Sequence, residues 1–399
     1  MHTVEVQQLN AAKPFAAIDL CAAAGGFSLG ASSSTCSVWA AFEGCPTAAG
    51  TYARAFGSRV QREGDATYVQ QRAAGARRLI DSEGGDPWRF GHPVFVQDIT
   101  EFAVMLEWVH YIEGRIGRRI NVVLCSPPCQ PFSTSGGKSR INNARKDIAM
   151  ACVAIAVAIR ARIFCLENVR LFAGSPQGKA VIRRLEAAGY AVRAQLVNAH
   201  KLGVPQRRQR ILLVAVRAER VSRRRLQQVL DAAVDDSRNE MRQRADTTVR
   251  DVFGRFDFYH LRIWEPSVPR PPSRMPARVH SADEPAWTLL SGCCVLPPRR
   301  YVARAADAAP LRLATVLQPC EIGMLQGFPR SWPWPHASIY CDCQFCFTSI
   351  RPAVGQEIGN AIPPAMGAWC MRMASAAVAF DPLQITAVRA KVHDCNYDG

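Results

Sequence analysis

The chain has no apolar run of the roughly 20 residues that a membrane span needs. Its longest apolar run, Ile148 to Ile159, is rich in alanine and predicts a buried helix instead. The beginning, Met1 to Pro14, has no basic stretch followed by an apolar one, so no secretory signal peptide is expected. We therefore expect a protein that is neither membrane-bound nor secreted. The expected location is the cytoplasm of a bacterial or virus-infected cell, or the nucleus in a eukaryote.

Acidic residues are scarce relative to basic ones, with 33 Asp and Glu against 49 Lys and Arg and a net charge of +16. This excess of mostly arginine charge suits a polyanionic partner, of which nucleic acid is the commonest. Cysteine is abundant, and 15 cysteines without a secretion signal favour free thiols in a reducing compartment. The 399 residues allow one large domain or two of ordinary size.

Strand-like and helix-like segments alternate in the first half of the chain, which predicts βαβ units. The expected fold class is α/β, with a Rossmann-like, doubly wound, mostly parallel sheet. The predicted strands are 15–19, 37–42, 93–96, 121–124, 163–166, 191–197 and 211–216.

The composition changes from about 250 to 345, where proline, tryptophan and short aromatic clusters replace helical periodicity. The segment Pro266 to Pro276 predicts no regular element. The end, Gln356 to Ala379, returns to a helical pattern and is expected to pack on the first domain. We predict a first domain of residues 1–216 plus 350–399 and a smaller, irregular domain of residues 217–349.

A predicted helix with a charged connector, Ala218 to Arg244, opens the second of these regions. Its Arg223–Arg225 run is interpreted as a solvated helix face, with a phosphate contact as the alternative.

Cys129 follows a short apolar strand and two prolines, in the order Leu124-Cys-Ser-Pro-Pro-Cys129. Prolines fix φ and cannot extend the strand, so the loop that carries this thiol is stiff. Ligands of open α/β sheets bind at the carboxyl ends of the strands, where this loop lies. A thiol suits attack on an electrophilic ring carbon, and the alternative is a small buried hydrophobic residue.

Three acidic residues end three successive predicted strands: Asp19, Glu43 and Asp98. The turn after Asp19 holds small residues through Gly25 and Gly26, which lets backbone amides approach a ligand. It lacks the GxGxxG pattern, so dinucleotide binding has little support. Carboxylates can accept hydrogen bonds from a ribose diol and an adenine amino group, which favours an adenosine cofactor without phosphates, such as S-adenosylmethionine. The alternative is plain acidic residues at strand ends.

Glu167 directly follows the fifth predicted strand, and neighbouring parallel strands would bring its carboxyl beside the Cys129 loop. It is a candidate proton donor, with helix capping as the alternative. Before the last strand stands Gln206-Arg-Arg-Gln-Arg210. On extended spacing, Arg208 and Arg210 project to one side, where they could hold a base edge, a phosphate or a carboxylate.

These segments together resemble the C5-cytosine DNA methyltransferases, in order and over most of the chain. The resemblance rests on the following residues: Pro128-Cys129-Gln130, Glu167-Asn168-Val169, Gln206 with Arg208 and Arg210, Leu325 to Pro329, Gly359 to Pro364 and, more faintly, Asn143-Ala-Arg145 with Ile148. Departures from the family pattern are Cys21 and Ala23 in the cofactor loop, Asn143, and Gly44 after Glu43.

The resemblance implies a set of site residues. Implied catalytic residues are Cys129, Glu167, Arg208 and Arg210. Implied S-adenosylmethionine contacts are Asp19, Ala23, Gly25, Gly26, Phe27, Glu43, Asp98, Ile99, Pro127 and Asn360. Implied substrate contacts are Gln130, Ser133, Gln206 and Thr288, and no metal is implied. The resemblance makes the first domain the catalytic, S-adenosylmethionine-binding domain and the smaller one, 217–349, the target-recognition domain. Arg270, Arg274 and Arg278 in the smaller domain are candidate phosphate or guanine contacts, with plain surface charge as the alternative.

The resemblance also implies a reaction on double-stranded DNA by a single chain. The Cys129 thiolate would attack C6 of a flipped cytosine, Glu167 would donate to N3, Arg208 would orient the base and the carboxyl group, and C5 would take the methyl group. Alternatives are a tRNA methyltransferase of the same fold and a DNA-binding regulator with an inactive catalytic domain. Cys341, Cys343 and Cys346, with Cys320, Cys293 or Cys294 as a fourth ligand, are an alternative zinc site. The sequence does not indicate whether a restriction endonuclease partner exists.

Overall fold

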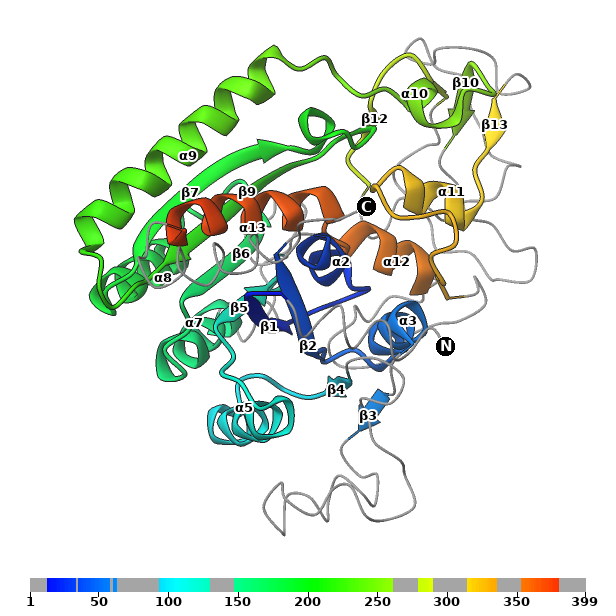
Figure 1. The fold of residues 1–399 in the computed structure, drawn as a ribbon. Coiled ribbons are helices and arrows are strands. Elements are labelled where there is room, and N and C mark those ends of the chain that lie inside the picture. The colour runs from blue at the N-terminus through cyan, green and yellow to red at the C-terminus, as the bar shows by residue number, and fades with distance from the viewer. Residues whose placement is uncertain are drawn as a thin grey trace, which may run out of the picture.

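The computed structural model describes residues 13–33, 35–57, 60–62, 93–129, 147–260, 279–289, 314–335 and 353–379. An eight-stranded sheet lies at the centre of the molecule (Figure 1), in the order β3-β4-β2-β1-β5-β6-β9-β7. The strands are β1 (Phe15–Leu20), β2 (Cys36–Phe42), β3 (Val60–Arg62), β4 (Val94–Val96), β5 (Val122–Cys125), β6 (Ile163–Val169), β7 (Ala191–Asn198) and β9 (Gln209–Val216).

Neighbouring strands are parallel except at β9, which runs antiparallel to both β6 and β7. The chain builds outward from β1 to β2 and β4, then returns to add β5 and β6 on the other side. This reversal between β1 and β5 makes a switch point at the carboxyl ends of these strands, where ligands of doubly wound sheets bind. The α/β prediction and all seven predicted strands are confirmed, while β3 was not predicted.

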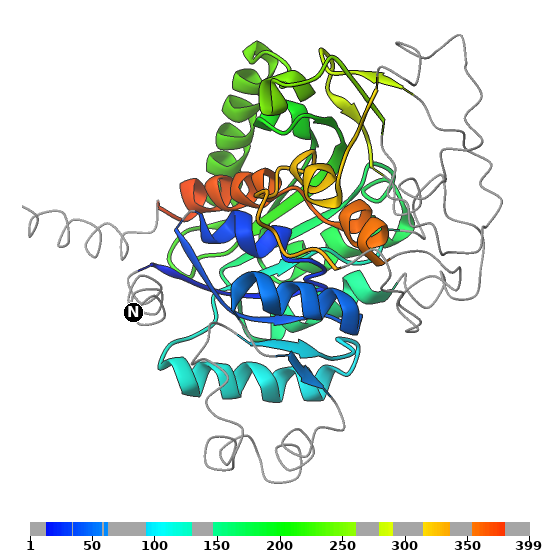
Figure 2. The ribbon, with the colours of Figure 1, turned by 90° about the vertical axis from the view of Figure 1, so that its right-hand side faces the viewer.

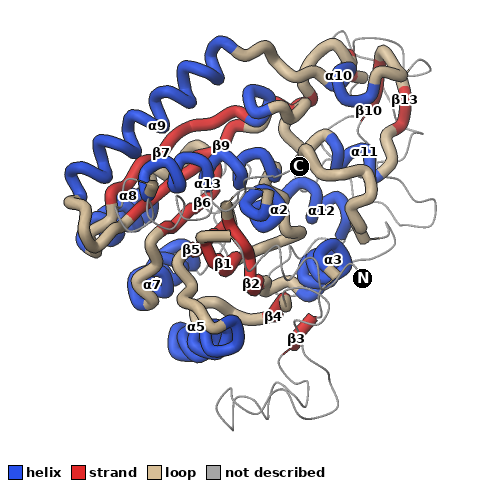
Figure 3. The backbone as a smooth tube through the Cα atoms, viewed as in Figure 1, coloured by secondary structure: helices blue, strands red, loops and turns tan. Residues whose placement is uncertain are grey.

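Helices cover both faces of the sheet because its central strands are apolar on both sides (Figure 3). One face packs against α5 (Phe102–Ile116), α7 (Ile148–Ala158) and α8 (Pro176–Ala187). The other packs against α2 (Gly26–Ser32), α9 (Arg223–Gln243) and α13 (Pro364–Val378). Successive side chains of a strand point to opposite faces of the sheet. Ile18 and Leu20 therefore face the first group of helices, whereas Ala17 faces the second.

The predicted buried helix at 148–159 is confirmed as α7. The helical pattern near the end is confirmed as α12 (Ala353–Asn360) and α13. As expected, α13 packs on the first domain, where Figure 2 shows it beside α2.

Helix α9, which follows the predicted domain boundary at 217, packs with the central sheet. Helix α9 buries Leu226, Leu230 and Val234 in the same apolar cluster as β7, β9 and α13, so it belongs with the sheet. Their spacing of four residues forms the apolar stripe that attaches the helix. The Arg223–Arg225 run is exposed, as predicted. We propose that the second domain begins after α9.

The second region contains short elements: α10 (Val249–Phe253), β10 (Phe258–His260), β11 (His280–Ser281), β13 (Thr315–Val316) and α11 (Pro319–Met324). Its apolar cluster includes Val249, Tyr259 and Leu325, together with Val354 and Ile358 of α12. A parallel pair, β12 (Ala286–Trp287) with β8 (Gln206–Arg207), ties it to the sheet side. α12 therefore contributes to the core of the second region. The segment Pro266 to Pro276 and the three candidate arginines near it lie outside the described residues.

Candidate active site

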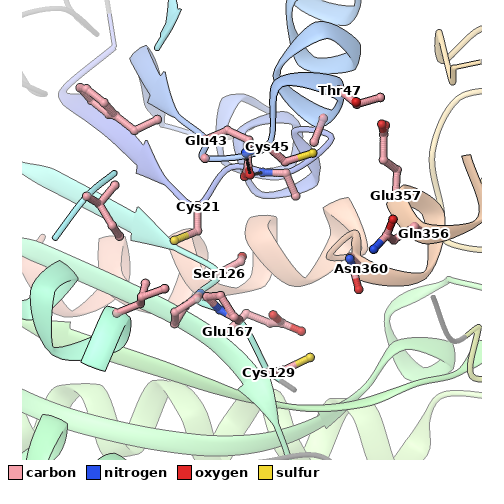
Figure 4. Close-up of a pocket in the computed structure, with 18 of the residues that line it drawn as sticks. Cys21, Glu43, Cys45, Thr47, Ser126, Cys129, Glu167, Gln356, Glu357 and Asn360 are labelled. Atoms are coloured by element: carbon pink, nitrogen blue, oxygen red, sulfur yellow. Dashed lines mark hydrogen bonds between the residues drawn. The ribbon is translucent and has the colours of Figure 1, made fainter. Parts of the chain in front are cut away.

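One pocket opens at the carboxyl ends of the central strands, with a volume of about 1100 Å³ that includes its open mouth. Residues after β1, β2, β4 and β5 line it, together with Glu167 inside β6, and α12 closes the opposite side (Figure 4). The lining includes Cys129, Glu167, Arg208 and Arg210 together with Ala23, Glu43, Asp98, Ile99, Pro127 and Asn360. The structure thus brings all four predicted catalytic residues and six of the predicted cofactor residues to one cavity.

The Cys129 loop is held at two neighbouring residues where it leaves β5. At its beginning, Ser126 N donates to Leu20 O at 3.2 Å. Asn168 Nδ2, at the end of β6, donates to Pro127 O at 3.1 Å. Because Asn168 is fully buried, this bond fixes the loop relative to the neighbouring strand. Burial raises the pKa of the Cys129 thiol, Arg210 and Arg208 lower it, and Glu167 raises it.

Glu167 and Arg210 form a buried ion pair, with Arg210 Nε 2.8 Å from Glu167 Oε1. The sheet register explains the contact. Val169 pairs directly with Arg210 across the antiparallel strands, and Glu167 lies two residues before Val169 on the same face. Figure 4 shows the Glu167 carboxyl near the Cys129 thiol, and Arg210, which pairs with this carboxyl, lines the same pocket.

Arg208 projects to the same side as Arg210, as the extended spacing predicts, and is 1% exposed. Its guanidinium donates to the carbonyls of Leu289, Gly359 and Ala361 at 3.0 to 3.1 Å. These bonds join the sheet to the second region and to α12. The sequence-based prediction gave Arg208 the task of orienting the carboxyl group; the ion pair to Glu167 is made by Arg210.

The cofactor loop is anchored by Glu43. Its Oε2 accepts from Ala23 N at 2.7 Å and its Oε1 accepts from Cys45 N at 2.8 Å. Cys21 and Ala23 have φ values of 56° and 48°, in the region that favours glycine. Asp98 Oδ1 accepts from Thr100 N and Oγ1 at 2.9 and 2.7 Å. Both carboxylates therefore shape backbone turns at the pocket wall.

Four predicted cofactor residues do not line this pocket: Asp19, Gly25, Gly26 and Phe27. Asp19 is fully buried and accepts from Ser28 Oγ at 2.6 Å, and Tyr52 donates to that hydroxyl at 2.8 Å. Burial raises the pKa of Asp19 to about 7. An added Cβ at Gly26 would lie 1.9 Å from Ile362 O, so this glycine permits the close approach of α2 to the chain before α13. Gly25 has a φ of 93° and caps α2. These residues build the wall behind the pocket.

Of the predicted substrate residues, the structure describes Gln206 and Thr288. Gln206 is fully buried and donates to Leu325 O at 3.1 Å, while Thr288 Oγ1 donates to Arg207 O at 2.6 Å. Both contacts join the sheet side to the second region, and neither residue lines the pocket. Gln130, Ser133 and Asn143 to Arg145 lie outside the described residues.

Sequence reasoning missed several pocket residues, notably Glu357 and Gln356 on α12 and Thr47 at the beginning of α3 (Pro46–Phe56). Burial raises the pKa of Glu357 to about 8, against lowering contributions from Thr51 and Arg54. The signal that could have found Glu357 is its position three residues before Asn360, one turn away on the same helix face.

The donor set fits a phosphate-free adenosyl cofactor. Among the described lining residues, the basic ones are Arg208 and Arg210, which lie by Cys129 and Glu167. The remaining wall offers carboxylates and apolar side chains such as Ile99, Pro127 and Phe42. The described part of the chain contains no cluster of His, Cys, Asp or Glu suited to a metal ion. The cysteines of the alternative zinc site, Cys320 apart, lie outside it.

The fold and this pocket define an α/β protein with a doubly wound sheet and a cysteine beside an acid–arginine pair. A profile of the C-5 cytosine-specific DNA methylase family matches residues 92–265. The predicted resemblance to this family is confirmed by this match and by the relatives that follow.

Among known proteins, the chain is 26% identical over 280 residues to the type II methyltransferase M.HindV of Haemophilus influenzae, covering 69% of this chain and 79% of that one. It is 28% identical over 284 residues to M.HgiDI of Herpetosiphon aurantiacus, covering 69% and 77%. The Dnmt2 methyltransferase structure of S. pombe aligns with a TM-score of 0.54 at 13% identity, covering 92% of this chain and 99% of that one. This last likeness supports the fold. In the described residues, no helix is long and apolar enough to span a membrane.

Proposed function

We propose that the chain is a DNA (cytosine-5)-methyltransferase that acts on a cytosine flipped out of double-stranded DNA. The observation that carries this proposal is the meeting of Cys129, the Glu167–Arg210 ion pair and the cofactor wall in one pocket. A ring carbon inside a duplex is out of reach of such a pocket, so the base must leave the stack.

In the proposed reaction, the Cys129 sulfur bonds to C6, and the electron pair of the C5–C6 bond moves toward C5 and the N3 side of the ring. The Glu167 carboxyl, in its protonated form, stabilises this charge by donating its proton toward N3, and Arg210 holds the carboxyl in place. C5 would then take the methyl group as the methyl–sulfur bond of the donor breaks, and the electron pair of that bond would stay on the donor sulfur. Removal of the C5 proton returns the electron pair to the ring and breaks the S–C6 bond. Without a donor at C6, C5 of cytosine is a poor nucleophile.

Bound S-adenosylmethionine would supply the methyl group. Glu43, Asp98, Ile99, Pro127 and Asn360 would hold it, because they line the same pocket and none of them is basic. The positive charges of Arg208 and Arg210 favour the thiolate of Cys129, which burial disfavours.

Single-base mapping of 5-methylcytosine in a methylation-deficient bacterial host tests the proposal. We expect methylation in a fixed short sequence, and its loss in the Cys129→Ala variant. An unmethylated genome in cells that contain the folded wild-type protein would contradict DNA methylation. Purified protein that methylates a tRNA transcript but no duplex would assign the RNA substrate instead. Calorimetric binding of S-adenosylmethionine without any transfer would leave an inactive regulator.

A further inference from the structure

The opposite edge of the sheet carries a row of basic residues. We define the basic edge as the six arginines beside the amino-terminal ends of β5 and β6 and the end of β9: Arg118, Arg119, Arg160, Arg162, Arg217 and Arg220. The strands pair at this edge as Val122 with Ile163 and Ile163 with Val216, so the residues just outside them are neighbours in space. Arg217 N donates to Arg162 O at 2.8 Å, and Arg119 Nη2 donates to Ile159 O at 3.3 Å.

Helix α9 extends this row. It begins at the same edge, since Arg223 Nη1 donates to the carbonyl of Glu186 at the end of α8, 3.2 Å away. The exposed Arg223–Arg225 run therefore continues the basic edge. In Figure 1 this end of α9 lies away from the second region, which gathers around α10 and α11.

Three of the six arginines, Arg119, Arg160 and Arg220, are exposed, whereas the other three are half-buried. The Arg119 and Arg160 side chains are 66% and 62% exposed, although they pair with Glu113 and Glu219. Arg160 also has a φ of 56°, a conformation that favours glycine. The chain thus keeps a long cationic side chain where glycine would relieve roughly 1 kcal/mol of backbone strain.

The edge cannot touch the nucleic acid segment whose base enters the pocket. The pocket lies at the carboxyl ends of the strands, and the basic edge lies at their amino ends. Seven-residue β6 separates the two by about 20 Å. The row itself crosses from β5 to α9 beside β7, over several strand spacings of about 4.8 Å each. This length matches the phosphates of a short stretch of duplex, which repeat about every 3.4 Å along each strand.

We infer that the basic edge binds a second segment of duplex DNA through its phosphates, without reading its sequence. The inference rests on the proposed function for the identity of the polyanion. Arginine forks suit phosphate oxygens, and two opposed DNA-binding edges would let the protein pass directly from one segment to another. An anionic membrane surface or an acidic protein would be other occupants, and the test below separates them.

The test compares two full-length variants that each lose three positive charges. The edge variant carries Arg160→Gly, Arg220→Gln and Arg224→Gln. The control variant carries Lys179→Gln, Arg238→Gln and Arg242→Gln, which lie on α8 and α9 away from the edge. We expect the slope of log K against log salt, for a random-sequence duplex, to fall by up to about 3 in the edge variant. The control should keep the wild-type slope.

A second readout is the dissociation of a labelled duplex chased with unlabelled duplex. For wild type and control, the observed rate should rise with competitor concentration, because transfer occurs through a doubly bound protein. For the edge variant, the rate should not depend on competitor.

The inference would be overturned if the edge variant kept the wild-type slope of log K against log salt. It would also be overturned if the edge variant and the control variant lost the same amount of slope. An edge variant that loses only binding to anionic vesicles or to polyglutamate would overturn it as well. Methylation of a short cognate duplex is measured in parallel and should be unchanged in the edge variant. If neither the wild type nor either variant methylates DNA but both binding measurements give the expected results, the proposed reaction is contradicted. The binding of a second DNA segment is then still supported.

Discussion

The two sides of the pocket treat their buried carboxyl groups differently. On the base side, Glu167 is paired with Arg210 at 2.8 Å. On the cofactor side, burial raises the pKa of Asp19 to about 7 and that of Glu357 to about 8. Among the described contacts neither of these two carboxyls has an ion pair. Burial is therefore common to the carboxyl groups on both sides, whereas an arginine pairs with the carboxyl group where the ring chemistry is proposed.

Removing the arginine should therefore have the largest effect. In Arg210→Met, Glu167 loses its orienting partner, and we expect turnover to fall about 100-fold or more. Leaving the buried Glu167 without its partner should also cost about 3 kcal/mol of unfolding free energy. Steady-state kinetics and urea unfolding measure the two losses, and Arg210→Lys should recover part of each.

If Arg210→Met weakens S-adenosylmethionine binding as strongly as it lowers turnover, the two sides of the pocket do not act separately. Calorimetry on the variant decides this, with Cys129→Ala as a control that keeps the ion pair. A nearly unchanged cofactor affinity would show that the two sides of the pocket act separately.

Local patterns allowed the base side to be predicted better than the cofactor side. Cys129, Glu167 and Arg210 each follow or begin a strand with clear apolar character, so their meeting at one sheet edge follows from parallel pairing. The role of Gly26 could not be predicted, because it depends on Ile362, a residue far along the chain. Glu357 was missed because α12 reaches the pocket only through tertiary packing. The place of α9 depended on which face its apolar stripe covers, which composition does not reveal.

The next prediction concerns Asp19 and the pH dependence of the unfolding free energy. Its pKa is about 7 in the folded protein against an ordinary 3.8, so the folded state binds the proton more tightly. Stability from this group is present below about pH 4 and is lost as pH rises through about 7. The shift corresponds to about 4 kcal/mol across this window. Asp19→Asn should remove that slope, as measured by urea unfolding at a series of pH values.

Asp251→Asn is the matched control. Hydrogen bonds from Thr248 lower the pKa of this exposed carboxyl, so its loss acts at lower pH and should leave the slope between pH 4 and 7 in place. An Asp19→Asn curve parallel to the wild-type curve would mean that Asp19 is ionised in the folded protein at neutral pH. The contrast between the two sides of the pocket would then rest on Glu357 alone.

Substitution of Gly26 should have the smallest effect on stability. It tests whether this residue builds the pocket wall or contacts the ligand. A methyl group here would lie 1.9 Å from Ile362 O, so Gly26→Ala should push α2 away and cost about 1–3 kcal/mol. Gly114→Ala on α5 meets nothing within 4 Å and should gain up to about 1 kcal/mol from helix propensity. Thermal unfolding measures both. Below the unfolding transition, Gly26→Ala should bind S-adenosylmethionine nearly as tightly as wild type, because Gly26 lies behind the pocket wall. Full stability with a selective loss of cofactor affinity would instead return Gly26 to the ligand contacts that its motif predicted.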